Sequence, residues 1–160
     1  MDDRWSAADQ LQRSAIAGTL MDELLEQTIR DAFPDLPLPE QPLTTHRCSE
    51  CDEVDAVLAG RSWPEVAAAF PAYCHDAFPL LTPVARAYYL PAYMIAALDP
   101  ETGLQGISLE TAMEDGRLDP RCFTPAQRAA IWDWAKAYWR LIGAEAPPTS
   151  FAKHWAGACE

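Results

Sequence analysis

The chain has 160 residues, with 24 acidic and 12 basic side chains and a formal net charge of −12. A chain of this length buries a hydrophobic core as a single domain, here residues 1–160, without a disulfide framework. The negative charge repels phosphate backbones and anionic lipid headgroups, so we expect neither nucleic acid nor membrane as a ligand. It attracts basic proteins, although acidity is also common where charge serves only solubility.

The cysteines and the start of the chain predict the compartment. Five cysteines are an odd number, and no basic region followed by an apolar stretch opens the chain, so we expect neither secretion nor disulfides. The longest apolar run, residues 88–98, is shorter than the roughly 18 residues of a membrane span and is interrupted by Pro91. We therefore expect a cytoplasmic protein with reduced thiols, and the sequence leaves its oligomeric state open.

Apolar positions recur every three or four residues and β-branched residues are few, which predicts an all-α fold, a compact helical bundle. The first helix is expected over residues 7–33. Its apolar face would consist of Leu11, Ile16, Leu20, Leu24 and Phe33. The prolines at 34, 37, 39 and 42 end this helix and predict an extended connection that leads to the cysteine cluster.

Capping patterns mark the later helices. A short helix after the cysteine cluster is expected to end at Gly60. Ser62 followed by Glu65 predicts a capping box, and Thr82-Pro83 and Thr124-Pro125 predict two further starts. Pro91 would interrupt the helix that begins at Thr82, because proline cannot donate a backbone hydrogen bond. The helix from Thr124 should end at Gly143, and Ser150 should cap a last short helix that carries Phe151 and Trp155.

The densest concentration of reactive side chains is His46, Cys48 and Cys51. Two sulfurs in a Cys-x-x-Cys pair converge on one ion, so this spacing is compatible with zinc. A fourth ligand would have to come from Cys74, His75, Cys122, His154 or Cys159. Packing of two buried thiols at a helix start is the favoured explanation of the pattern, and a thioredoxin-like redox pair would require a βαβ unit that the sequence does not predict.

Three other groups of side chains are candidates for a functional role. Cys74 and His75 are adjacent, and neighbours in sequence seldom reach the geometry of a nucleophile and its base. The acidic run Glu50, Asp52, Glu53 and Asp55 is either a solvated helix start or an edge that binds a basic partner. An aromatic set is interpreted mainly as core, with an exposed binding surface as the alternative: Tyr88, Tyr89, Tyr93, Trp132, Trp134, Tyr138 and Trp139.

The cluster also carries a resemblance. The elements His46-x-Cys48-x-Glu50-Cys51, then Trp63, then Tyr-Tyr-Leu-Pro-Ala-Tyr-Met at 88–94, resemble an uncharacterised family of small bacterial proteins, a domain of unknown function. The resemblance covers about residues 25 to 140. It implies a shared fold and marks these residues as its signature, but it supplies no substrate.

These observations predict a binding protein without enzymatic activity. Small size, acidity and the lack of a complete catalytic constellation are typical of immunity proteins that neutralise a basic antibacterial toxin, such as a nuclease, by direct binding. In that case Glu50, Asp52, Glu53 and Asp55 would contact the partner. The alternatives are a zinc-stabilised structural module and a metal-dependent enzyme, both built on His46, Cys48 and Cys51.

Overall fold

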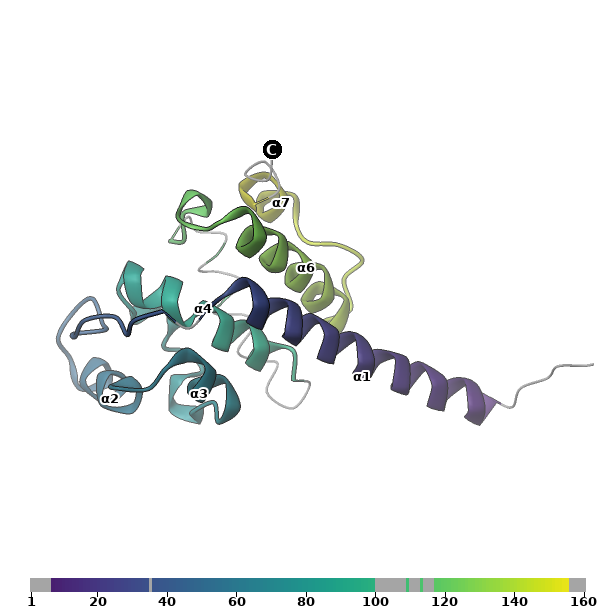
Figure 1. Cartoon of the computed structure of the whole chain (residues 1–160), viewed down its shortest axis with the longest axis horizontal. Coiled ribbons are helices and arrows are strands. Elements are labelled where there is room, and N and C mark those ends of the chain that lie inside the picture. Colours follow the sequence, from purple (N-terminus) through teal and green to yellow (C-terminus); the bar gives the residue numbers. More distant parts are fainter. Residues whose placement is uncertain (1–6, 35, 100–108, 110–112, 114–116, 156–160) are drawn as a thin grey trace, which may run out of the picture.

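The computed structural model describes residues 7–34, 36–99, 109, 113 and 117–155, and this part of the chain is helical (Figure 1). Its α-helices are α1 (Ala7–Ala32), α2 (Ser49–Leu58), α3 (Trp63–Ala68), α4 (Pro83–Ala97), α6 (Pro125–Leu141) and α7 (Thr149–Trp155). Short 3-10 turns lie at Ala72–Cys74, Phe78–Leu80 and Pro120–Cys122. The all-α prediction is confirmed. None of the described helices is both long enough and apolar enough to cross a bilayer.

The helix starts follow the capping patterns. The Thr82 hydroxyl accepts a hydrogen bond from the Ala85 N–H, and Thr124 and Gln127 cap each other. At α3 the Glu65 carboxylate accepts from both the N–H and the hydroxyl of Ser62, and these two bonds lower the pKa of Glu65. The predicted cap of the last helix is wrong, because α7 begins at Thr149 and Ser150 lies within the helix.

Helix α4 lies between two layers of the molecule. In Figure 1, α2 and α3 lie on one side of α4, and α6 and α7 lie on the other. Hydrogen bonds from buried rings tie the layers together: the Tyr93 hydroxyl donates to the carbonyl of Cys74 at 2.8 Å, and the indole N–H of Trp134 donates to that of Met94 at 2.8 Å. One hydrophobic cluster connects residues of all these helices.

The structure tests two predictions about this core, one on the aromatic set and one on Pro91. The aromatic set is core, since all its members are buried except Trp132, which is half-buried. Pro91 lies inside α4 and is buried, and the helix continues through it to Ala97. The proline removes one backbone donor without ending the helix, because the packed neighbours of α4 hold the segment helical.

The predicted apolar face of α1 is buried only at its C-terminal end. Ile29 and Phe33 are buried at its C-terminal end, but Leu11, Leu20 and Leu24 are exposed. Figure 1 shows the reason, since the N-terminal half of α1 extends beyond the body of the molecule. Periodicity identifies the residues that share a helix face, but it does not say how much of that face the rest of the chain covers.

Candidate metal centre

The extended segment after α1 leads directly to the cysteine cluster. Its end pairs with the loop before α4: the Thr45 N–H donates to the Leu80 carbonyl at 2.9 Å, and the Thr82 N–H donates to the Leu43 carbonyl at 2.7 Å. These bonds fix the backbone immediately before His46. The predicted route from the proline-rich connection to the cluster is therefore confirmed.

The two cysteines occupy the beginning of α2. Cys48 is the N-cap residue, and its Sγ accepts a hydrogen bond from the Cys51 N–H at 3.3 Å. Cys51 therefore lies in the first turn of the helix, with its side chain directed back toward Cys48. Cys51 is buried, Cys48 is half-buried and His46 is exposed, so the group connects the interior to the surface.

The three side chains form one compact donor set. The Sγ atoms of Cys48 and Cys51 are 3.1 Å apart, and Cys51 Sγ lies 3.4 Å from His46 Nδ1. All three ligand atoms lie within 4.8 Å of one another. A tetrahedral zinc ion with bonds of about 2.3 Å to sulfur and about 2.0 Å to nitrogen separates its ligand atoms by about 3.5 to 3.8 Å. The set could hold an ion such as zinc if the two sulfurs separate slightly and the widest pair of ligand atoms, up to 4.8 Å apart, moves closer.

Burial and the neighbouring Cys48 thiol raise the pKa of Cys51. Without a cation, the protonated thiol is therefore the predominant form of Cys51 at neutral pH. A bound metal ion would replace that proton, since cysteine binds metals as the thiolate.

Tyr73 borders the centre and could not be recognised from the sequence. Its hydroxyl interacts with the Glu53 carboxylate, and this hydrogen bond, together with partial burial and the nearby Glu53, Glu50 and Cys48, raises the pKa of Tyr73 to about 12. The phenol therefore remains neutral and can only donate to Glu53. Tyr73 belongs to the 3-10 turn after α3, which no local pattern places beside α2.

Asp55 has a structural role that its acidic neighbours on α2 do not share. Its carboxylate accepts from the Leu43 N–H at 2.9 Å and from the Thr44 hydroxyl at 3.1 Å, which attaches the extended segment to α2. Asp55 is half-buried, whereas Glu50, Asp52 and Glu53 are exposed. Of the predicted partner-binding residues, these three are exposed to a partner, whereas Asp55 attaches the extended segment to α2.

The four predicted fourth ligands that the structure describes do not join the group. Cys74 is buried elsewhere, and burial raises its pKa to about 11, which also makes it a poor nucleophile beside His75. The His75 ring packs against Phe70, and His154 contacts the Leu118 carbonyl. Cys122 is exposed in a different part of the molecule. Cys159 lies outside the described residues.

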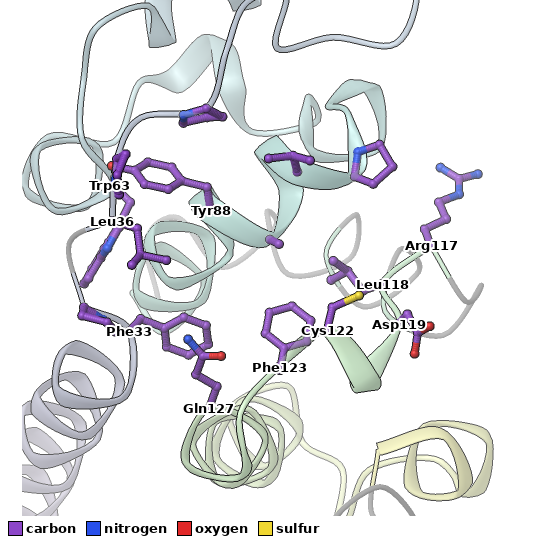
Figure 2. Close-up of a pocket in the computed structure, with 16 residues that line it drawn as sticks. Phe33, Leu36, Trp63, Tyr88, Arg117, Leu118, Asp119, Cys122, Phe123 and Gln127 are labelled. Atoms are coloured by element: carbon purple, nitrogen blue, oxygen red, sulfur yellow. The ribbon is translucent and has the colours of Figure 1, made fainter.

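A separate apolar cleft of about 490 Å³ lies between the proline-rich segment, α4 and the start of α6. Figure 2 shows Phe33 and Phe123 at its centre, with Trp63 toward one end and Asp119 toward the other. None of the metal-centre residues lines it. Trp63, part of the family resemblance, therefore belongs to this cleft and not to the donor set.

Comparisons with known proteins add no assignment: no protein-family model, curated protein or solved structure matches the chain. The resemblance to the domain of unknown function stays a prediction.

Proposed function

We propose that the protein binds one zinc ion through His46, Cys48 and Cys51, and that the ion stabilises the junction between the extended segment and α2. The observation that carries the proposal is the convergence of three donor atoms within 4.8 Å at the start of a helix. Two sulfurs and one imidazole are ligands that zinc prefers over the oxygen-seeking cations magnesium and calcium. Water or a partner's side chain would complete the tetrahedron.

The structural role follows from where the ligands lie. His46 comes from the segment that pairs with the loop before α4, while Cys48 and Cys51 begin α2. An ion between them reinforces the attachment that Asp55 makes one helical turn further along. A metal-dependent enzyme would use the same three ligands with the fourth position open to substrate.

The direct test is a zinc titration of the metal-free full chain against a chromophoric chelator. We expect one equivalent of zinc in the wild type and at least about a 100-fold loss of affinity in His46→Ala and Cys48→Ser, since changes of outer-shell residues alone cost about 10- to 100-fold. Cys122→Ser is the matched control, because it removes an exposed thiol outside the group. Weak binding in the wild type, or equal loss in the control, would contradict the proposal.

We also propose, as a second function, that the acidic side chains beside the centre bind a basic protein, such as a toxin neutralised by this chain as its immunity protein. The supporting observation is that Glu50, Asp52 and Glu53 are exposed together on the first two turns of α2, which carries no basic residue in its last turn. With the net charge of −12, this edge favours rapid electrostatic capture.

For such a partner, recovered by co-purification from the native host, we expect the association rate to fall as salt rises. The Debye length shortens from about 30 Å at 0.01 M to about 10 Å at 0.1 M. The double variant Glu50→Lys with Asp52→Lys should slow association at least about 10-fold at low salt. The variant Asp22→Lys with Glu23→Lys changes the net charge equally on exposed positions of α1 and should do much less. Equal effects of the two variants would refute a local acidic site.

A further inference from the structure

The sulfurs of Cys48 and Cys51 are closer than a zinc ion would hold them. Their separation is 3.1 Å, against about 3.8 Å for two thiolates on a tetrahedral zinc and about 2.05 Å in a disulfide bond. Residues three apart at a helix start are direct neighbours, so their side chains can meet without moving the backbone of α2. The geometry that the reduced pair adopts therefore lies between the metal-bound and the oxidised arrangements.

We infer that Cys48 and Cys51 form a reactive dithiol that exchanges with small-molecule disulfides. The sequence favoured other interpretations because it predicts no βαβ unit around the pair. What the reaction requires is narrower: two sulfurs in contact, one of which an incoming disulfide can reach. Both conditions are met here, since Cys48 is half-buried and Cys51 is fully buried behind it.

The difference in exposure sets the order of the steps. The Cys48 sulfur, as thiolate, attacks one sulfur of the disulfide RS–SR, which forms a mixed disulfide and releases RS⁻. The Cys51 sulfur, having lost its proton, then attacks Cys48 Sγ, which forms the Cys48–Cys51 bond and releases the second RS⁻. Both leaving groups take up the protons lost by the two cysteines, so the protein dithiol is oxidised and RS–SR is reduced to two RSH.

The exchange requires only the two sulfurs, so it goes beyond the zinc proposal and does not depend on it. It does affect zinc, however, because a disulfide removes two of the three ligands. The oxidised protein is therefore expected to bind no zinc at this centre.

The test uses the metal-free full chain, glutathione disulfide as the probe, and alkylation followed by peptide mass spectrometry. We expect the wild type to gain a Cys48–Cys51 disulfide, with neither of these two thiols left free for alkylation. Cys48→Ser should form no such bond, and Cys51→Ala should stop at glutathione attached to Cys48. Cys122→Ser, which removes an exposed thiol elsewhere, should form the internal disulfide like the wild type.

His46→Ala separates this inference from the zinc proposal. It removes an exposed zinc ligand and leaves both sulfurs in place, so it should lose zinc affinity and still form the disulfide. The inference is overturned if glutathione disulfide modifies Cys122 while Cys48 and Cys51 both stay reduced. It is equally overturned if the wild type accumulates glutathione on Cys48 as Cys51→Ala does, since Cys51 would then not complete the exchange.

Discussion

Removal of zinc from the loaded protein is expected to lower its melting temperature by about 5 to 10 °C. A ligand present at 100 times its dissociation constant stabilises the folded state by about 2.7 kcal/mol. In a chain of this size, 1 kcal/mol shifts the melting temperature by about 2 to 4 °C. The stabilisation arises because the unfolded chain does not hold His46, Cys48 and Cys51 within 4.8 Å of one another. Thermal unfolding followed by circular dichroism, with zinc and with chelator, measures the shift.

The informative quantity is the difference between the two melting temperatures of each variant. His46 is exposed, so His46→Ala should retain the wild-type melting temperature in chelator and lose the response to zinc. Cys122→Ser should keep the full response. A wild type whose melting temperature is the same with zinc and with chelator would show that the centre contributes no folding free energy from metal.

Local sequence patterns predicted most of the helices because their causes are local. A Thr or Ser cap satisfies backbone N–H groups within its own first turn, so Ser62, Thr82 and Thr124 mark helix starts that need no tertiary information. The exposed half of α1 shows the limit. Leu20 and Leu24 are spaced like buried residues, but the chain places no surface over them.

In the metal centre, too, local features could be predicted from the sequence and long-range contacts could not. The donor set lies within six residues, so its spacing alone identified His46, Cys48 and Cys51 as candidate ligands, and the structure brings the three together. The residues around it come from distant positions: Tyr73 interacts with Glu53, and Asp55 binds the backbone of Leu43. Because these contacts depend on how the helices pack, sequence patterns alone predicted the same partner-binding role for Asp55 as for its exposed neighbours.

Replacement of Trp134 by Ala is expected to cost about 3 to 5 kcal/mol, a large share of the stability of a single domain. The Trp134 side chain is fully buried in α6 and stacks on Tyr138 with ring centroids 5.1 Å apart. Its indole N–H donates to the Met94 carbonyl in α4 at 2.8 Å, so the residue connects two helices as well as filling the core. Urea unfolding followed by circular dichroism measures the loss.

Two further variants separate the causes of that loss. Trp134→Phe keeps most of the ring volume but leaves the buried Met94 carbonyl without its donor, which should cost about 1 to 3 kcal/mol. Trp132→Ala, two residues earlier in α6, removes a half-buried ring that stacks on Phe151. It should cost clearly less than Trp134→Ala, because much of the lost surface already faces water. Equal losses at the two tryptophans would mean that α6 does not present Trp134 to α4, and that the aromatic residues of this helix do not divide into core and surface as their burial indicates.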